Sequence, residues 1–252
     1  MNLRAAAQAA ALPENDNAPA SAGAFALGHA LTRLPGGSRI IGRFATEHRM
    51  SASPIDPSPR LLAFAGSLRA GSYNRRLIPV LAEGARAAGA QVTLVELRDY
   101  PLPIYDGDIE AEGLPENALR LQALLGEHDG LLISTPEYNG SMPALVKNTL
   151  DWISRPMPGG RSGTTLFADK VAGIVSASPG PLGGLRSLLV LRDALAKLGL
   201  IVVPQQVAVG QAAEKLHDYG QLDDERAREA VHRVGAAVVR HLKVYTPIGA
   251  SA

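Results

Sequence analysis

Five short aliphatic runs, each followed by a segment with helical spacing of apolar residues, constrain the fold of this chain most. The runs cover residues 61–65, 92–97, 130–134, 171–175 and 200–203. Because they contain few polar residues, they are typical of strands buried on both faces, as in a parallel sheet between two layers of helices. We therefore predict a doubly wound α/β fold with five parallel strands and helices on both faces. Its ligands are expected beyond the carboxyl ends of the strands.

The segments between the runs carry the expected crossover helices. Apolar residues recur three or four positions apart, for example at Leu77, Leu81 and Ala85. The predicted helices cover about residues 74–88, 116–125, 143–153, 185–198 and 223–241. Residues 101–115 are rich in Pro, Gly and Asp and are predicted to form a loop.

Composition excludes several classes of protein. The 252 residues include no cysteine, which excludes disulfides, iron–sulfur clusters and a thiol nucleophile. A formal net charge of +1 argues against a dedicated nucleic-acid binder, and the six histidines lack metal-ligand spacing. No apolar run reaches the ~18 residues that span a bilayer. We expect a soluble, cytoplasmic protein without a metal, a nucleic-acid partner or a membrane span.

The first 58 residues differ from the remainder, with Ala-rich patches, scattered Pro and Ser, and no lysine. We predict a flexible N-terminal extension over 1–58 and one domain over 59–252. The alternatives are an upstream start codon, with the true start at Met50, and a targeting presequence. A secretory signal fits poorly because Gln8 interrupts the early apolar stretch.

The first run is followed by the richest polar chemistry, in residues 66–74 (GSLRAGSYN). This segment joins a predicted strand to a predicted helix, whose N-terminus offers unpaired N–H groups and a partial positive charge to an anion. Ser67, Ser72 and Asn74 add hydrogen-bonding side chains. With the guanidinium of Arg69, these groups suit a phosphate. The alternative is an ordinary turn in which Ser72 or Asn74 caps the helix.

Two other phosphate-binding motifs are missing from the sequence. No Gly-Lys pair occurs, so there is no Walker loop. Residues 180–184 (GPLGG) approach a dinucleotide fingerprint, but Pro204 and Gln205 stand where an acidic residue is needed about 20 positions further on. We therefore do not expect NAD(P) to bind in the Rossmann manner.

Polar turns also follow the third and fourth runs. Residues 135–141 (TPEYNGS) combine a rigid backbone with polar groups that can bind the edge of a planar heterocycle. Residues 176–186 (SASPGPLGGLR) contain glycines that permit close approach of a flat ligand. The alternatives are a solvated turn and a flexible glycine-rich loop. Arg186 and Arg192 are expected to be solvated, or paired with Asp193 or a partner subunit.

Three segments agree in order and position with a known family. They are GSLRAGSYN (66–74), TPEYNGSMPALVKNTLDWISR (135–155) and SASPGPLGGLRSLLVLRDAL (176–195), together with PLPIYDGD (101–108). The chain resembles the NAD(P)H-dependent FMN reductases, in the branch of the bacterial quinone and chromate reductases, over about residues 60–210.

This resemblance implies a flavodoxin-like fold that holds FMN without a covalent bond. It assigns the FMN phosphate to Ser67, Arg69, Ser72 and Asn74, with Leu68 and Tyr73 lining the loop, and the ring to Pro136, Glu137, Tyr138 and Asn139. The turn with Ser176 and Ala177 is also expected to contact the cofactor. The family often has a small polar residue near position 177, so Ala177 is left with a backbone contact only.

The resemblance further implies an oxidoreductase that passes a hydride from NADPH or NADH through FMN to a quinone, a flavin, an azo compound or chromate. No catalytic side chain is expected, because FMN carries the chemistry. The alternatives are a flavodoxin-type electron carrier without NAD(P)H turnover, and a self-association role for helix 143–153 with Trp152 exposed on one flank. Trp152 itself is expected to pack in the core or at a dimer interface rather than to stack on the flavin, because aromatic residues on apolar helix faces usually pack. Family members form dimers and tetramers, so a homodimer or homotetramer is expected.

Overall fold

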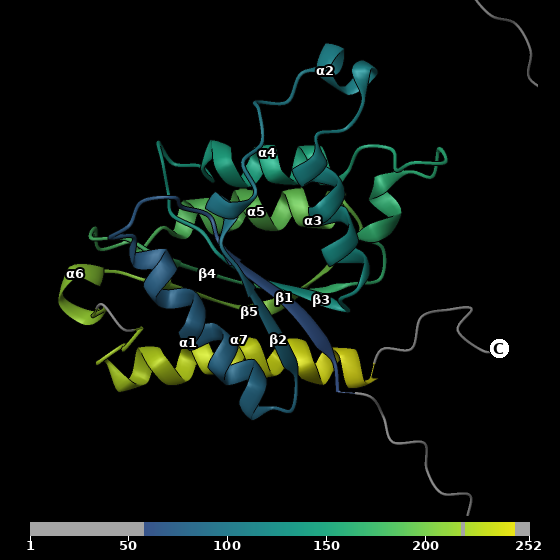
Figure 1. Ribbon diagram of the computed structural model, residues 1–252. Helices are drawn as coiled ribbons and strands as arrows, with labels where there is room; N and C mark the ends of the chain where they lie inside the picture. Colours follow the sequence, from purple (N-terminus) through teal and green to yellow (C-terminus); the bar gives the residue numbers. More distant parts are fainter. Residues whose placement is uncertain (1–57, 218–219, 245–252) are drawn as a thin grey trace, which may run out of the picture. The chain divides into compact units, whose positions relative to one another are not determined.

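The computed structural model describes residues 58–217 and 220–244. The expected extension over 1–58 lies outside the described residues apart from Ser58. A single parallel sheet has the strand order β2-β1-β3-β4-β5 (Figure 1). Its strands are β1 (Arg60–Ala65), β2 (Gln91–Val95), β3 (Gly130–Ser134), β4 (Val171–Ala177) and β5 (Ile201–Val209). The strand order reverses between β1 and β3, which puts a topological switch point at the centre of the carboxyl edge. The predicted doubly wound fold is confirmed.

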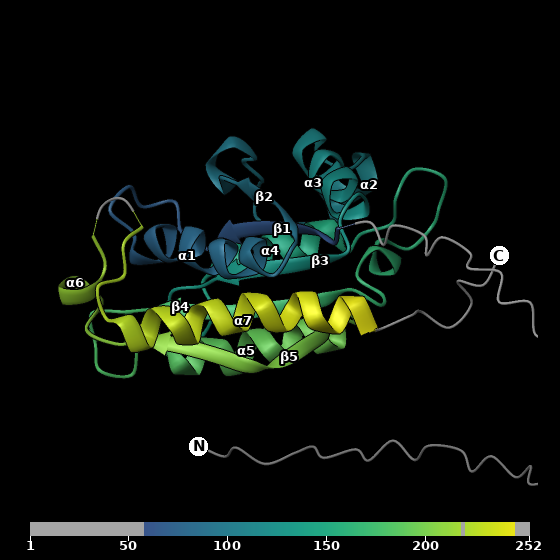
Figure 2. The same cartoon turned by 90° about the horizontal axis from the view of Figure 1, so that it is seen from below.

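Helices cover both faces of this sheet. One layer contains α1 (Tyr73–Ala87) and α7 (Glu225–Val244), and the other contains α3 (Glu116–Gly126), α4 (Ala144–Ile153) and α5 (Leu185–Lys197) (Figure 2). Each layer closes its own aliphatic core, one around Leu81, Val175 and Val238 and one around Ile133, Ile174 and Leu191. The buried strands therefore contribute apolar side chains to both faces, as the uninterrupted runs predicted.

Two glycines bring α1 and α7 into close contact. A Cβ atom on Gly84 would lie 2.4 Å from the Cα of His232, and one on Gly235 would lie 2.6 Å from the carbonyl oxygen of Leu81. The backbones of the two helices thus touch without intervening side chains. This contact holds the C-terminal helix against the helix that follows the first strand.

Strand β2 departs from the prediction of burial on both faces. It is the edge of the sheet and pairs only with β1. Leu94 is 44% exposed, and the strand ends at Val95, after which Leu97–Asp99 form a short 3₁₀ turn. The aliphatic composition did not reveal the edge position, because position in the sheet is a property of the topology.

Strand β5 is longer than the predicted run at 200–203 and contains a bulge. Ala172 pairs with Val202, but Ile174 pairs with Gln206. Arg192 of α5 fills the gap by donating to the carbonyl oxygens of Val202 (3.1 Å) and Val203 (2.8 Å) and to Oε1 of Gln206 (3.0 and 2.9 Å). Arg192 is therefore neither solvated nor paired with Asp193, and Pro204 is tolerated because it lies in the bulge.

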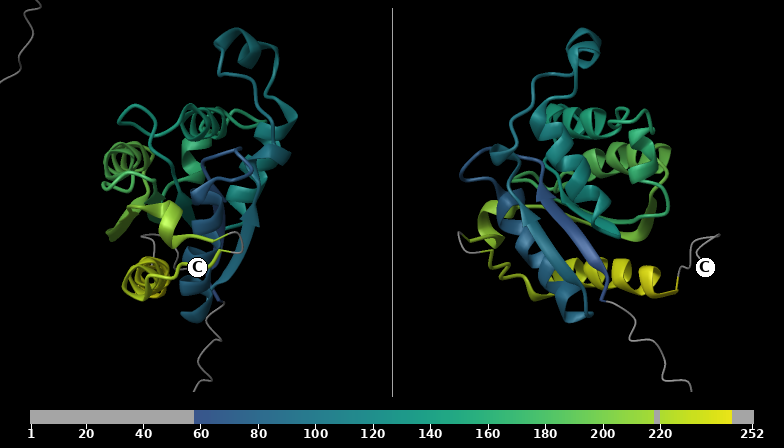
Figure 3. Two further views of the ribbon diagram at one scale, coloured as in Figure 1. Left: turned by 90° about the vertical axis from the view of Figure 1, so that its left-hand side faces the viewer. Right: turned by 45° about the vertical axis from the view of Figure 1, so that its right-hand side comes forward.

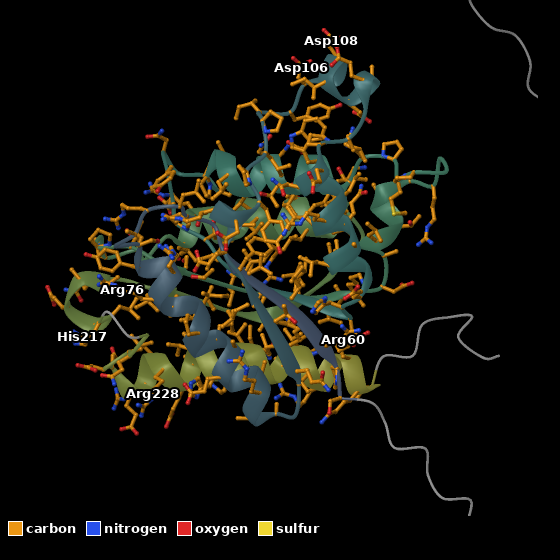
Figure 4. All side chains as sticks on the ribbon, in the orientation of Figure 1. Arg60, Arg76, Asp106, Asp108, His217 and Arg228 are labelled. Carbon is orange, nitrogen blue, oxygen red and sulfur yellow. The ribbon has the colours of Figure 1, made fainter. Side chains whose placement is uncertain are left out.

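The predicted loop over 101–115 contains a short helix, α2 (Gly107–Glu112), which stands away from the other described elements (Figure 3). Asp106 caps it by accepting the N–H of Asp108 at 2.9 Å, and both aspartates lie at the far end of this arm (Figure 4). Two further short turns, η2 (Gly163–Leu166) and α6 (Ala212–Lys215), lie in connections. Among the described residues, no helix is long and apolar enough to cross a membrane.

Candidate cofactor site

The loop between β1 and α1 lies directly beside β3 at the switch point. Gly66 donates its N–H to the carbonyl oxygen of Ser134 at 2.8 Å. A Cβ atom on Gly66 would lie 2.3 Å from Cγ2 of Val146 in α4, so only glycine lets the loop pass at this point. The loop is therefore fixed at its base by the central strand and by the helix that follows it.

Beyond Gly66, the side chains of Ser67, Arg69 and Ser72 and the N-terminus of α1 form what we call the cradle, whose positive charge no nearby carboxylate of the described chain neutralises. Ser67 and Ser72 are buried, and Ser72 is the N-cap of α1 with its side chain free of a capping bond. The first turn of α1 has no acidic residue, and the guanidinium of Arg69 lies 5.6 Å from the ring centroid of Tyr73. In the part of the chain that the structure describes, no carboxylate pairs with Arg69. Hydroxyls, N–H groups and an unpaired cation suit the phosphate of a mononucleotide.

Asn74 is buried below this cradle and has other partners. Its Nδ2 donates to the carbonyl oxygen of Ala177 at 2.9 Å, and its Oδ1 accepts from the N–H of Ala177 (3.0 Å) and the hydroxyl of Ser134 (2.9 Å). The side chain thus ties α1 to β3 and β4. Of the side-chain groups of Asn74, only the second N–H of the amide remains available for the expected contact with the phosphate. The backbone N–H and C=O of Ala177, which were expected to contact the cofactor, both already bond to Asn74.

The turn after β3 is a tight two-residue reversal. Tyr138 and Ser141 exchange backbone hydrogen bonds of 3.0 and 3.1 Å around Asn139 (φ 53°) and Gly140 (φ 77°). Positive φ at both central residues is typical of the Asn-Gly type I′ turn. Tyr138 is 52% exposed at the mouth of the site. The turn therefore presents a rigid backbone and one aromatic side chain.

Glu137 of this turn points away from solvent and caps α5. Its side chain is only 9% exposed, and its carboxylate accepts from the backbone N–H of Arg186 (3.0 Å) and from Nε (2.6 Å) and Nη2 of the same residue. Burial raises the pKa of Glu137, but the hydrogen bonds and charge of Arg186 outweigh it and leave the pKa below its usual value. Arg186 is thus ion-paired within its own chain.

The turn after β4 is packed against the end of β5. The hydroxyl of Ser176 is buried and donates to the carbonyl oxygen of Gly183 at 2.8 Å. A Cβ atom on Gly183, whose φ is +62°, would lie 2.6 Å from backbone atoms of Ala208 and Gly210. The side chain of Ser176 therefore shapes the glycine-rich turn, which is ordered by these contacts.

A cleft of about 300 Å³ opens between the β1–α1 loop, the turn after β3 and the start of α4, and a second hollow of about 400 Å³ adjoins it; no residue of the turn after β4 lines either space. The cleft is lined by residues 66–69, Tyr138 and residues 143–145. The side chain of Leu68, which is 46% exposed, lies between the two spaces and lines both. The first loop and the turn after β3 meet at this cleft, as the sequence predicted from their positions.

Burial settles the expectation for Trp152 and also places His128. Trp152 is fully buried in α4 and donates Nε1 to the carbonyl oxygen of Pro103 at 2.8 Å, which confirms the expected core packing and contradicts the alternative in which it is exposed on one flank. His128 is buried in a loop, with Nδ1 at 2.6 Å from the carbonyl oxygen of Leu124 and Nε2 at 2.8 Å from the hydroxyl of Thr93. In the described part of the chain, no group of His, Asp and Glu side chains is arranged to hold a metal.

The sheet order and the helices on both faces define a flavodoxin-like fold, and the cradle at the carboxyl edge of the sheet has the kind of donors that a mononucleotide phosphate needs. The family model for NADPH-dependent FMN reductase matches residues 59–214, and the chain belongs to that family. It is an oxidoreductase of a family whose cofactor is FMN and whose reductant is NAD(P)H. The β1–α1 loop fits the phosphate of FMN, because its donors and its cation are not neutralised by acidic groups.

Several characterised proteins are similar to this chain. A quinone reductase of Pseudomonas putida KT2440 is 38% identical over 161 residues, which cover 64% of this chain and 82% of the relative. An NAD(P)H-dependent FMN reductase of Pseudomonas aeruginosa is 34% identical over 175 residues, covering 69% and 90%. Among solved structures, the NAD(P)H:acceptor oxidoreductase FerB of Paracoccus denitrificans is 28% identical, with a TM-score of 0.62, and covers 74% of this chain and 98% of FerB.

Proposed function

We propose that this protein reduces a quinone at the expense of NAD(P)H, with FMN bound in the cleft beside the β1–α1 loop. The observation that carries this proposal is the uncompensated cradle at the N-terminus of α1, where one loop brings buried Ser67, buried Ser72 and Arg69 together with a first helical turn that has no acidic residue. Relatives from Pseudomonas, Escherichia coli and Solanum tuberosum are named quinone reductases or an NAD(P)H:quinone oxidoreductase, and one from Burkholderia is named for a hydroxyquinone. These names support a quinone as the acceptor.

We assign direct phosphate contacts to Ser67, Arg69 and Ser72, with Leu68 and Tyr73 lining the loop. The ring is assigned to the backbone of residues 136–139 and to the side chain of Tyr138. Asn74, Ser176 and Ala177 are assigned the role of holding these turns in place, because their polar groups already bond to one another or to Gly183.

When bound, FMN supplies hydride acceptance and two-electron transfer, so that NAD(P)H, a quinone and one proton yield NAD(P)⁺ and the quinol. The chain contributes binding and orientation. Arg69 and the α1 N-terminus hold the phosphate, and the Asn139–Gly140 reversal fixes the backbone that faces the ring. No side chain is assigned a proton-transfer role.

The test uses the purified full-length chain. We expect a yellow protein that releases FMN on denaturation, loses its flavin absorbance when mixed with NADPH or NADH under argon, and regains it when menadione is added. A protein that binds FMN but stays yellow with both nucleotides is an electron carrier, the alternative function. A protein that binds no FMN refutes both.

We also propose a homodimer or homotetramer in the cytoplasm, where NAD(P)H is available. Exposed apolar side chains in α5 and in the turn just before it support self-association. Leu182, Leu185 and Leu189 are each at least 40% exposed, and Val190 is next to them. Light scattering on the purified protein measures the subunit number.

A further inference from the structure

A hollow of about 400 Å³ beside the cofactor cleft has no role in the site described above. It lies between the segment after β2 and helix α4, and it shares Leu68 and Leu145 with the cleft. The remaining walls are mostly apolar and include Leu97, Leu102 and Tyr100. Small-molecule sites are typically ~300–1,000 Å³ and mostly apolar, with a few placed polar groups.

The walls of this hollow are held in place by hydrogen bonds. Asn148 of α4 accepts the N–H of Tyr105 and donates Nδ2 to the carbonyl oxygen of Pro103, both at 2.8 Å. The guanidinium of Arg120 lies 4.6 Å from the ring centroid of Tyr100. Because these contacts fix the position of the walls, binding there costs little further ordering.

Arg98 brings one positive charge to the rim. Its Nη2 donates to the carbonyl oxygen of Leu68, which occupies one of its five N–H groups. Among the described residues, no carboxylate oxygen lies within 4.0 Å of its nitrogens, whereas neighbouring Arg75 pairs with Glu96 at 3.0 Å. An exposed guanidinium with free N–H groups beside an apolar wall suits an organic anion.

Leu68 therefore lies between two arginines that lack a carboxylate partner in the described chain, Arg69 and Arg98. FMN carries one phosphate, which the proposed function assigns to Arg69 and the two serines. Arg98 belongs to the other hollow and is left for a second ligand. This inference thus rests on the proposed function.

We propose that the hollow binds the electron acceptor as an anionic ring compound. The ring lies against Leu97, Leu102 and Leu145, and a carboxylate, sulfonate or ionised hydroxyl group binds Arg98. A nicotinamide dinucleotide is also anionic, but its two riboses and its pyrophosphate require more hydrogen-bonding groups than these walls present. The subsite therefore selects among acceptors by charge.

Binding is tested without turnover, on the oxidised, FMN-loaded full chain, by calorimetric titration with naphthalene sulfonate, which FMN cannot reduce. Arg98→Ala is expected to weaken sulfonate binding about tenfold, because it removes one charge-assisted contact. Arg98→Lys is expected to weaken it less, because the positive charge remains. Leu102→Ala also weakens it by removing part of the wall. Arg75→Ala, which changes a paired arginine on the same edge, is expected to bind like the wild type.

Steady-state kinetics distinguish an acceptor subsite from a role of Arg98 in binding FMN or the nicotinamide dinucleotide. Arg98→Ala is expected to raise the KM for naphthoquinone sulfonate about tenfold, while the KM values for menadione, NADPH and NADH and the Kd for FMN change less than about twofold. Equal sulfonate binding in wild type and Arg98→Ala overturns the proposal. A weakened FMN complex would assign Arg98 to the cofactor phosphate, and a raised KM for NADPH would assign it to the dinucleotide; either result overturns the proposal.

These outcomes are distinct from failure of the proposed function. A chain that does not oxidise NADPH in the presence of menadione refutes quinone reduction, and Arg98-dependent sulfonate binding still reports the subsite. Conversely, the chain could reduce menadione and naphthoquinone sulfonate equally well, with either Arg or Ala at position 98. That result leaves the proposed function intact and removes the subsite.

Discussion

The carboxylate of Glu137 accepts the backbone N–H of Arg186 at 3.0 Å and its Nε at 2.6 Å, and so joins two turns of the cofactor site that lie 49 residues apart in sequence. Glu137 belongs to the turn assigned to the flavin ring, and Arg186 lies in the first turn of α5, after the glycine-rich turn. The pair therefore fixes the turn that we assign to the ring, although the carboxylate itself is turned toward α5.

We expect Glu137→Gln and Arg186→Ala to weaken FMN binding several-fold by loosening this link between the turns. The pH dependence is diagnostic. Because the pKa of folded Glu137 is lowered, its stabilising contribution is present above the ordinary carboxyl pKa and is lost as the pH falls through the lowered value. In Arg186→Ala the side chain that lowers this pKa against burial is gone, so the stabilising contribution and its loss in acid should both shrink. Unfolding midpoints and FMN fluorescence, measured from neutral pH down to about pH 3, check both effects.

We expect Arg69→Ala to weaken FMN binding by about 1.5–3 kcal/mol, the range for a hydrogen bond to a charged group. The loss should shrink in high salt, because Arg69 is exposed. The Kd follows from the quenching of flavin fluorescence on binding. Arg75→Ala is the matched control, since Arg75 already pairs with Glu96. Unchanged affinity in Arg69→Ala would remove this residue from the phosphate site.

Asn74→Ala is expected to lower the free energy of unfolding by about 2–3 kcal/mol, because it leaves both peptide groups of Ala177 and the buried hydroxyl of Ser134 without their partner. Urea denaturation of the FMN-free protein measures this loss separately from any effect on the cofactor. Asn117, whose amide bonds to Pro101 at an exposed site, is the control, and Asn117→Ala should change stability by no more than about 0.5 kcal/mol.

Gly84→Ala and Gly235→Ala are each expected to destabilise the fold by about 1–3 kcal/mol, despite the higher helix propensity of alanine, because the added methyl meets backbone atoms at 2.4–2.6 Å. Thermal unfolding followed by circular dichroism checks this. Gly107→Ala in α2 has open space around it and should be neutral or mildly stabilising. A stabilised Gly84→Ala variant would contradict the close approach of α1 and α7.

The local pattern of the sequence determined the order of strands and helices, the parallel sheet and the polar loop after the first strand. Hydrophobic periodicity and helix N-termini are properties of short segments, so they are present before folding. The same holds for the Asn139–Gly140 reversal, whose residues favour positive φ on their own. The motifs in residues 66–74 and 135–155 were sufficient to recognise the family that the comparison over residues 59–214 confirmed.

Only the tertiary structure decided which polar groups remain available for a ligand. Asn74 and Ala177 are 103 residues apart, and their mutual hydrogen bonds exist only because α1 and β4 meet at one edge of the sheet. The exposed edge position of β2, the bulge that Arg192 fills and the contact of Arg98 with the carbonyl oxygen of Leu68 likewise depend on neighbours distant in the chain. A residue's type sets what it can bind, whereas the packing around it sets which of those bonds it has already made.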